Sequence, residues 1–312
     1  MRIALAQIAP VWLQREATLN KVAKYITSAA QHGTQLVVFG EAMVPGYPFW
    51  LDATDGARFN SDLQKDLHAH YLQEAICIEK GHLSTITALA QQYEIAVVLG
   101  IIEKPLDRGG HSVYCSLVYI DPSGRIANIH RKLRPTYEER LCWSPGDGHG
   151  LRTFPLHEFT LGGLNCWENW MPLPRAALYG QGENLHIAIW PGNVRNTEVL
   201  TRFLAREGRS YCVSVSGVMR QEDVPENIPH AQYIRERLAA QPADGGSCIA
   251  QPDGSWLIPP LADKEELLLA ELDFQAVLRE RQNFDPAGHY SRPDITQLTV
   301  NRQRQSTIEL KD

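Results

Sequence analysis

The 312-residue sequence has no C-x-x-C pair and no apolar run long enough to span a membrane. Its six cysteines are scattered along the chain, at positions 77, 115, 142, 166, 212 and 248. This spacing indicates neither a disulfide framework nor a zinc site. The longest fully apolar run covers residues 95–102, whereas a membrane-spanning helix needs about 20 apolar residues. We therefore expect no membrane partner.

The sequence also lacks a strong excess of charge of one sign. The net charge of −6 at pH 7 is spread along the chain, which argues against a nucleic acid or an anionic membrane as partner. Residues 1–8 lack the apolar core of a signal peptide and are typical of a strand. With 44% hydrophobic and 21% charged residues, the composition is that of an ordinary globular protein. We expect a cytoplasmic enzyme or binding protein.

Strand-like and helix-like segments alternate from the beginning of the chain. After the first strand, apolar residues recur at three-to-four spacing over residues 18–33, which predicts a helix with Thr18 as its N-cap and Gly33 at its end. Residues 36–39 are continuously apolar, as in a strand buried on both faces. A strand, a helix and a second strand in this order indicate an α/β protein.

The same reasoning extends along the rest of the chain. Residues 220–245 are polar and interrupted by prolines, so we expect a long surface excursion. The tail from residue 302 is polar and is expected to fray. Because no linker divides the sequence, we predict a single domain over residues 1–301 followed by the tail 302–312. Further helices are predicted at 61–79, 83–93, 196–209 and 274–283, and strands or hairpins at 95–102, 112–121, 126–131, 158–164, 185–190, 211–219, 247–257 and 266–272.

Cys166 lies between a strand and a helix. The preceding residues 159–161 alternate as in a strand, Gly162 and Gly163 permit a close approach of the chain, and a helix begins near Pro172. Such a junction exposes a side chain, and a helix N-terminus favours a thiolate over a thiol. The alternative is that Cys166 is a small buried apolar residue, which is the commoner role of a free cysteine.

Two more reactive residues directly follow predicted strands, Glu41 and Lys132. The carboxyl ends of strands are where α/β proteins bind ligands, so these side chains and Cys166 are expected to meet at one rim. A carboxylate can take the thiol proton, and an ammonium can stabilise the negative charge that develops on a substrate. Glu139 could orient Lys132 or act as a second acid–base group. Taken singly, each of these residues could instead be a solvated charge.

Three motifs around these residues resemble those of the nitrilase superfamily of carbon–nitrogen hydrolases. They are VVFGE at residues 37–41, HRKLRPTYEER at 130–140 and GGLNCWEN at 162–169, and residues 285–294 resemble the C-terminal motif of the family. Trp167 and Glu168 after the cysteine, the Arg-Lys-Leu-x-Pro-Thr pattern around Lys132 and the GDG sequence at 146–148 are similar to true nitrilases. The chain departs from the family at Gly40, where proline is usual. Glycine relaxes the backbone, so we expect Glu41 to be held less rigidly.

The resemblance implies a fold and a mechanism. The fold is a four-layer α-β-β-α sandwich, and the enzyme needs no metal or organic cofactor. Cys166, deprotonated by Glu41, attacks the carbon of a small-molecule nitrile and forms a thioimidate. Lys132 and the backbone amide of Trp167 stabilise the developing negative charge, and Glu139 holds Lys132 or positions water. The products are a carboxylic acid and ammonia. The resemblance also implies a homo-oligomer, either a dimer or a higher helical assembly.

Two alternatives remain at this point. One is an amidase or carbamoylase that uses the same Glu-Lys-Cys triad, and the other is a catalytically silent ligand-binding protein on the same scaffold.

An apolar, aromatic-tolerant substrate pocket is a further hypothesis, although its aromatic residues could equally belong to the core or to an interface. His68 and His70 form an H-x-H pair, but surface histidines on a helix are the simpler explanation. The aromatic residues assigned to the pocket are Tyr47, Phe49, Trp50, Trp167, Trp170 and Trp190.

Overall fold

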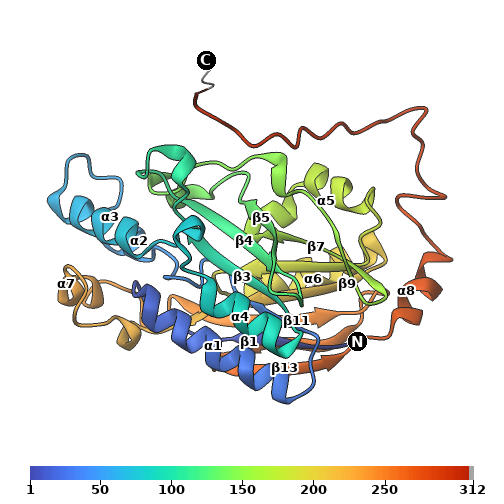
Figure 1. The fold of residues 1–312 in the computed structure, drawn as a ribbon, viewed down its shortest axis with the longest axis horizontal. Coiled ribbons are helices and arrows are strands. Elements are labelled where there is room, and N and C mark those ends of the chain that lie inside the picture. Colours follow the sequence, from blue (N-terminus) through green and yellow to red (C-terminus); the bar gives the residue numbers. More distant parts are fainter. Residues whose placement is uncertain (309–312) are drawn as a thin grey trace.

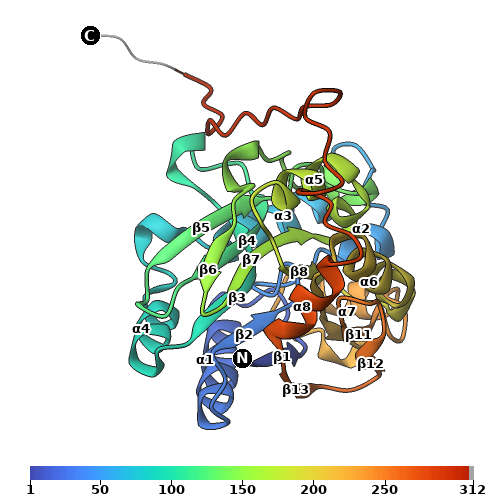
Figure 2. The same cartoon turned by 90° about the vertical axis from the view of Figure 1, so that its right-hand side faces the viewer.

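The computed structural model describes residues 1–308 as two β-sheets stacked face to face and covered by helices (Figures 1 and 2). The first sheet has the strand order β13-β1-β2-β3-β4-β5. Its strands are β1 (Arg2–Gln7), β2 (Leu36–Phe39), β3 (Ala96–Glu103), β4 (Tyr114–Ile120), β5 (Ile126–Arg131) and β13 (Glu266–Glu271).

The second sheet has the order β10-β11-β9-β8-β7-β6, and β12 pairs with β11 beside this path. Its strands are β6 (Phe154–Leu156), β7 (Phe159–Asn165), β8 (Leu185–Trp190), β9 (Tyr211–Ser216), β10 (Val218–Met219), β11 (Ala243–Ala250) and β12 (Trp256–Ala262). The central strands β7, β8 and β9 are parallel. They are largely buried on both faces, as is usual for parallel strands inside a sheet.

The interface between the two sheets is the largest part of the core. One buried cluster joins alternate residues of both sheets, because side chains along a strand point to opposite faces in turn. The first sheet contributes residues such as Leu5, Val38 and Val98, and the second contributes residues such as Ile187 and Val213.

Helices cover the outer face of each sheet. On the first sheet, α1 (Arg15–Gln31) and α4 (Ser84–Tyr93) bury their apolar faces against β2 and β3. On the second sheet, α6 (Val194–Gly208) packs against β8, β9 and β11, and α5 (Pro172–Tyr179) lies beside it. The predicted four-layer α-β-β-α sandwich is therefore confirmed.

Further helices surround this sandwich. Four are α-helical, namely α2 (Trp50–Ala53), α3 (Asp62–Glu74), α7 (Ala231–Arg235) and α8 (Phe274–Arg281). Six are 3-10 turns, namely η1 (Ile78–Lys80), η2 (Leu106–Arg108), η3 (Tyr137–Leu141), η4 (Gly148–Gly150), η5 (Cys166–Trp170) and η6 (Gln221–Asp223). Within residues 1–308, no helix combines the length and the apolar character that crossing a membrane requires.

Two local predictions were wrong. Thr18 does not cap the first helix, because α1 begins at Arg15 and its N-cap position is Gln14. The Thr18 hydroxyl is buried within the helix and donates to the Val11 carbonyl oxygen at 2.9 Å. The predicted strand 211–219 is divided into β9 and β10 at Gly217.

Residues 220–245 are more than a surface excursion. Val224, Ile228, Ile234 and Leu238 are buried in the same cluster as Trp12, Trp50 and Tyr71. Four spaced apolar residues are enough to anchor a polar segment, since burying each of them contributes about 1.5–3 kcal/mol. The segment is thereby held against the loops that follow β1 and β2.

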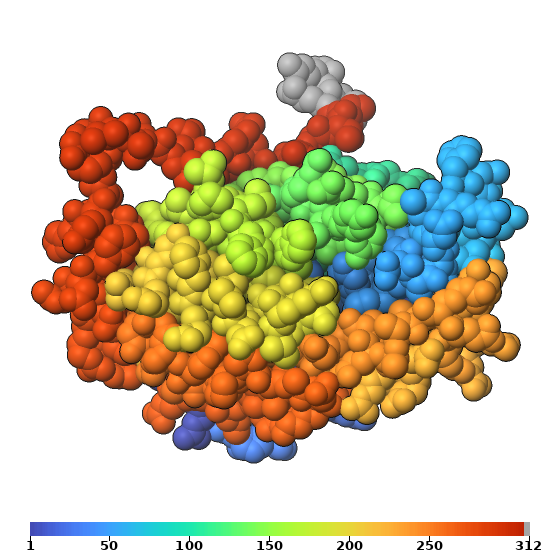
Figure 3. Space-filling model, turned by 180° about the vertical axis from the view of Figure 1, so that it is seen from behind, coloured from blue at the N-terminus to red at the C-terminus, as the bar shows by residue number. Residues whose placement is uncertain are grey.

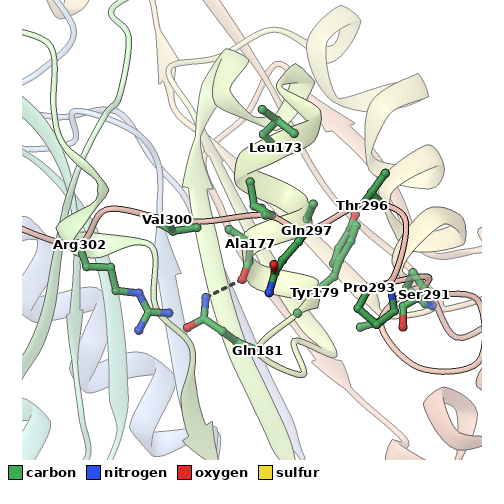
Figure 4. Close-up of a pocket in the computed structure, with 15 residues that line it drawn as sticks. Leu173, Ala177, Tyr179, Gln181, Ser291, Pro293, Thr296, Gln297, Val300 and Arg302 are labelled. Atoms are coloured by element: carbon green, nitrogen blue, oxygen red, sulfur yellow. Dashed lines mark hydrogen bonds between the residues drawn. The ribbon is translucent and has the colours of Figure 1, made fainter.

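The C-terminal segment runs across the outside of α5 (Figures 1 and 3). Between this segment and α5 lies a cavity of about 900 Å³ (Figure 4), but its lining residues include no cysteine or carboxylate. Beyond it, Asp147 accepts hydrogen bonds from the Arg304 guanidinium and the Gln305 amide, both at 2.9 Å. Residues 304 and 305 of the predicted tail are thus hydrogen-bonded to Asp147, and residues 309–312 lie outside the described part of the chain.

Candidate active site

The three residues that follow predicted strands meet at one end of the sandwich. Glu41 follows β2 and Lys132 follows β5, and these strands point in the same direction because β2 and β3 are parallel and two antiparallel pairings lead from β3 to β5. Cys166 directly follows β7 of the second sheet. The two sheets thus deliver a carboxylate, an ammonium and a thiol to a common point.

The distances join these groups into one cluster. Lys132 Nζ lies 2.9 Å from Glu41 Oε1 and 2.7 Å from Glu139 Oε2. The reactive atoms of Glu41, Glu139 and Cys166 all lie within 4.8 Å of one another. All four side chains are at least 96% buried, since the most exposed, Cys166, retains 4% of its accessible surface. An ammonium between two carboxylates and beside a thiol is the arrangement that the motifs predicted.

A strained backbone places the cysteine in this cluster. Cys166 has a positive φ of 46°, a conformation that a side chain with a Cβ rarely adopts and that costs of the order of 1 kcal/mol or more. It begins the turn η5 (Cys166–Trp170), and Glu168 Oε2 accepts from the Asn165 amide at 2.8 Å in front of that turn. The junction is therefore a tight 3-10 turn, and the helix α5 begins six residues after Cys166.

Burial governs the electrostatics of the cluster. It raises the pKa of the Cys166 thiol well above its usual range, and the Lys132 ammonium acts in the opposite direction. Burial and the Glu139 carboxylate raise the pKa of Glu41 to about 7, although Lys132 opposes them. For Lys132 burial works against the charged form, but Cys166, Glu41 and Glu139 together hold its pKa well above the usual value. The cluster thus contains a lysine that stays charged and a carboxyl that can take up a proton near neutral pH.

A third buried carboxylate, that of Glu168, joins the segment after β5, which contains Lys132, to the segment after β7, which contains Cys166. Glu168 lies 3.1 Å from His130 Nε2 through both of its oxygens, and its Oε1 also accepts from the Leu133 amide at 2.6 Å. Burial alone would raise the pKa of Glu168, but His130 and the two backbone amides lower it overall. A single ionised side chain therefore fixes the segment after β5 against the segment after β7.

Gly40 has a packing role rather than the loosening role that we expected. A Cβ at Gly40 would lie 2.9 Å from the Gly217 nitrogen and 3.0 Å from the Trp190 carbonyl oxygen, both backbone atoms. The Glu41 amide donates to that same Trp190 carbonyl at 3.1 Å. The absence of a side chain lets the second sheet approach and hold Glu41.

One neighbour of the cluster was not predicted. Cys115 is buried on β4, and its Sγ donates to Glu41 Oε1 at 3.5 Å, while its carbonyl oxygen accepts from the Lys132 amide at 2.7 Å. Only the pairing of β4 with β5 places it beside the cluster.

A cavity of about 480 Å³ leads to Cys166. Its walls come from five separate parts of the chain: the loop after β2, the turn η3, the turn η5 that begins at Cys166, the segment around residue 192 and the segment around residue 240. Its lining includes Tyr47, Phe49, Thr136, Glu138, Glu139, Cys166, Trp167, Asn193, Arg195, Arg237 and Gln241. Part of the 220–245 segment thus forms a wall of the cavity.

The predicted aromatic residues divide into two groups. Tyr47, Phe49 and Trp167 line the cavity, and the Tyr47 hydroxyl donates to Glu139 Oε1 at 3.0 Å. Trp50, Trp170 and Trp190 are absent from its lining. Trp50 and Trp190 are buried in the core, and Trp170 is exposed on the outer surface.

The same cluster is a candidate for a cation. Glu41, Glu139 and Cys166 offer ligand atoms at a spacing that could hold a metal ion. Lys132 Nζ already pairs with both carboxylates at 2.9 and 2.7 Å, so an ammonium supplies the positive charge there. No second cluster of this kind is found among residues 1–308, and the H-x-H pair at His68 and His70 belongs to none.

This fold and cluster agree with the comparison to known families. The chain belongs to the carbon–nitrogen hydrolase family, whose sequence profile matches residues 2–282. Within that family its similarity lies with nitrilases. It is 34% identical to "Nitrilase 2" of an unknown prokaryotic organism, over 99% of this chain and 95% of that protein. It is 33% identical to an aliphatic nitrilase of Rhodococcus rhodochrous, over 98% of this chain and 84% of that protein.

Solved structures show the same architecture at lower identity. The fold is similar to that of Saccharomyces cerevisiae Nit3, a member of branch 10 of the nitrilase superfamily, with a TM-score of 0.72 and 19% identity over 93% of this chain and 96% of that one. It is also similar to a carbon–nitrogen hydrolase of Helicobacter pylori, with a TM-score of 0.70 and 20% identity over 94% and 96% of the two chains. These neighbours support the fold.

Proposed function

We propose that this protein is a nitrilase that converts an organic nitrile and two water molecules into a carboxylic acid and ammonia. The observation that carries the proposal is the buried contact of Lys132 with Glu41 and Glu139 beside Cys166. The similarity to nitrilases over nearly the whole chain favours a nitrile as substrate. Glu41, Lys132, Cys166 and Glu139 are the proposed catalytic residues.

The first half of the reaction uses Glu41 as a base. Its Oε2 atom is buried and has no hydrogen-bond partner among the described residues, so it can take the Cys166 thiol proton. The thiolate sulfur then bonds to the nitrile carbon and gives a thioimidate. Lys132 faces the site with an ammonium that can stabilise the negative charge on the nitrile nitrogen and donate a proton to it. The proton held by Glu41 then passes to Lys132, whose Nζ lies 2.9 Å from Glu41 Oε1, and Glu41 is ionised again.

The second half of the reaction consumes water. One water, deprotonated by Glu41, adds to the thioimidate carbon, and the resulting tetrahedral intermediate expels ammonia to leave a thioester. A second water releases the carboxylic acid and restores the thiol. The Trp167 amide, which opposes the rise that burial causes in the Cys166 thiol pKa, is also the proposed donor to the oxygen of the intermediate.

Ammonia release from a panel of aliphatic, aryl and arylaceto nitriles tests the proposal. Wild type is expected to release ammonia from at least one class, and Cys166→Ala from none. Cys77→Ala is the matched control, because Cys77 is also a buried free thiol but lies before η1 and does not line the cavity that contains Cys166. Ammonia release by Cys166→Ala, or none from wild type, would contradict the assignment. Faster release from matched amides than from nitriles would indicate an amidase, and the absence of any covalent adduct on Cys166 would indicate a binding protein.

Tyr47 and Trp167 are the proposed substrate-contacting aromatic residues. Both line the cavity that contains Cys166, whereas Trp170 and Trp190 do not. The walls also carry polar and charged groups such as Asn193, Arg195 and Glu138. The proposed substrate therefore places an apolar or aromatic group beside Tyr47 and Trp167.

Self-association is part of the same proposal. Large apolar side chains are exposed side by side on η5, α5 and α6, and the Arg175 guanidinium lies 5.8 Å from the Phe203 ring centroid and so links α5 to α6. Such a patch is typical of a protein–protein interface. Its residues are Trp170, Met171, Leu173, Val199 and Phe203.

Size-exclusion chromatography with light-scattering detection measures the mass of the assembly. Phe203→Glu is expected to reduce the mass of the assembly, because it places a charge in the patch. Leu278→Glu is the matched control, since Leu278 is similarly exposed on α8 outside the patch. An unchanged mass for Phe203→Glu, or a monomeric wild type, would exclude this surface as the interface.

A cytoplasmic location is also proposed, because all six cysteines are unpaired, as is usual in a reducing compartment.

A further inference from the structure

A buried chain of polar side chains lies behind the cysteine turn and is not used in the mechanism above. It contains Glu183, His186 and Asn169, of which the most exposed, His186, retains 4% of its accessible surface. His186 Nδ1 lies 2.9 Å from Glu183 Oε1, and His186 Nε2 lies 2.7 Å from Asn169 Oδ1. Asn169 Nδ2 in turn donates to the Cys166 carbonyl oxygen at 2.8 Å.

The donors and acceptors of these side chains fix the direction of the hydrogen bonds between them. Asn169 Nδ2 faces two carbonyl oxygens, those of Cys166 and Leu164 at 2.8 and 3.4 Å, so the other end of the amide is its oxygen. An amide oxygen only accepts, and therefore His186 Nε2 must be the donor to it. The Asn169 side chain is thus oriented at one end by His186 and holds the Cys166 carbonyl at the other.

The Cys166 carbonyl belongs to the same peptide unit as the Trp167 amide. A trans peptide is planar, so its C=O and N–H point in opposite directions and turn together. The Trp167 N–H opposes the rise that burial causes in the Cys166 thiol pKa, and it is the proposed oxyanion donor. A side chain that fixes the Cys166 carbonyl consequently fixes the direction of that donor.

Gly162 leaves the space that the buried Glu183 carboxylate occupies. A Cβ on Gly162 would collide with Glu183 Oε1, so the first glycine of the cysteine motif is what admits the Glu183 carboxylate behind β7. The positive φ of Cys166, 46°, needs support from its surroundings to persist. Asn169 supplies a bond to the strained residue itself.

We infer that Glu183, His186 and Asn169 form a buried relay that orients the Cys166–Trp167 peptide toward the reacting atoms. They are positioning residues that do not contact the substrate. The inference rests on the proposed function for its kinetic consequence, whereas its effect on the reactivity of Cys166 is independent of the substrate.

Asn169→Asp is the decisive variant. It keeps the size of the side chain and an acceptor for His186, but a carboxylate oxygen cannot donate to the Cys166 carbonyl. Its kcat for nitrile hydrolysis is expected to fall about 100-fold, as when one oxyanion donor is lost. KM is expected to stay within about threefold, because substrate binding is not altered. His186→Leu is expected to lower kcat, and His186→Gln, which retains a donor, to recover part of the loss.

Cys212→Ala is the matched control for packing. Cys212 is buried and pairs with His186 across β8 and β9, so this variant disturbs the same region without removing a relay bond. It is expected to lower the melting temperature and to keep kcat. A kcat for Asn169→Asp within about threefold of wild type, or a loss no larger than that of Cys212→Ala, would overturn the inference.

Alkylation of Cys166 by chloroacetamide at neutral pH separates this inference from the proposed function. The Trp167 N–H also stabilises the thiolate, so Asn169→Asp is expected to react roughly tenfold more slowly, the effect of about one unit of thiol pKa. If wild type hydrolyses no nitrile but this difference appears, the proposed function fails and the relay stands. If wild type hydrolyses nitriles and Asn169→Asp changes neither rate, the relay fails.

Discussion

The Glu41 carboxyl sets the pH dependence of the proposed reaction at the scale of single residues. Its burial and the neighbouring Glu139 raise its pKa to about 7 in spite of Lys132. As a base it must be ionised, so the rate is expected to fall as the pH falls through 7. A carboxyl of ordinary pKa would keep the rate constant down to much lower pH.

Glu139→Gln tests the cause of this shift. Removing the Glu139 charge removes one of the two influences that raise the pKa of Glu41, and it leaves Lys132 free to pair with Glu41 alone. The acidic limb of the kcat/KM profile is therefore expected to move to lower pH, while kcat itself falls because Lys132 loses a partner. The measurement is a pH–rate profile of both proteins. A limb that stays in place or moves to higher pH would contradict the assignment of Glu41 as the titrating base.

Substrate selectivity depends on single side chains in the cavity. Trp167 lines it and is half exposed, whereas Trp170 is equally exposed but faces outward. Trp167→Ala is expected to change the ratio of kcat/KM between an aryl and an aliphatic nitrile by about tenfold, the effect of losing one large apolar contact. Trp170→Ala is the control and should leave the ratio unchanged. Equal effects of the two variants would remove Trp167 from the pocket.

At the scale of elements, the site depends on joining the loop after β5 to the loop after β7. Glu168 does this with three donors directed at one carboxylate, from His130, Leu133 and Asn165. Its pKa is depressed, so its stabilisation is present above the ordinary glutamate pKa and is lost as the pH falls below that range.

Glu168→Gln is expected to lower the free energy of unfolding by about 3 kcal/mol, because a glutamine has one acceptor oxygen and its NH₂ group would face a donor. Urea denaturation at neutral pH measures the change. Glu158→Gln is the same substitution at an exposed site and should stay within about 0.5 kcal/mol of wild type. An equally small change for Glu168→Gln would show that Glu168 does not hold the loop after β5 against the loop after β7.

The register of one hairpin shows why the site was only partly predictable from the sequence. The segments 112–121 and 126–131 were predicted from the sequence, and simple counting from Ile120 and Ile126 would place Cys115 opposite Arg131. A β-bulge between Tyr119 and Ile120 shifts the pairing by one residue. The shift brings Cys115 to Lys132 and thus to Glu41, and no residue type in the strand announces it.

At the scale of the whole molecule, the C-terminal segment is fastened far from where the last helix ends. Arg304 donates to Asp147 at 2.9 Å and to the Ile129 carbonyl at 3.0 Å, and Gln305 donates to the other Asp147 oxygen. Ile129 lies on β5, three residues before Lys132. The segment is thus connected to the strand that carries the catalytic lysine.

Asp147→Asn is expected to release this segment, because it removes the charge that pairs with Arg304. Trypsin should then cleave after Arg302 and Arg304 at least about threefold faster than in wild type, since cleavage requires a locally opened chain. Mass spectrometry of the fragments over time measures this. Asp253→Asn, in the turn between β11 and β12, is the control and should not change the rate. Unchanged cleavage in Asp147→Asn would show that Asp147 does not hold the segment.

The sequence by itself determined the elements and the identity of the reactive groups. Continuous apolar runs mark β2 and β3, which are buried on both faces. Apolar residues spaced by three to four positions mark the helices α1 and α6, because burial on a helix repeats at that interval. The three motifs contain Glu41, Lys132 and Cys166, which the structure brings together. These features are local, and so a single sequence contains them.

Only the tertiary structure decided what surrounds those groups. Glu183 and Gly162 are 21 positions apart, and they meet because β7 and β8 are adjacent in the second sheet. Residues 220–245 are polar on average, yet four apolar anchors turn them into a wall of the cavity. Trp167 and Trp170 lie in the same 3-10 turn, three positions apart, but Trp167 lines the cavity and Trp170 faces outward. Contacts between distant segments depend on the packing of the whole chain, and composition and spacing do not specify them.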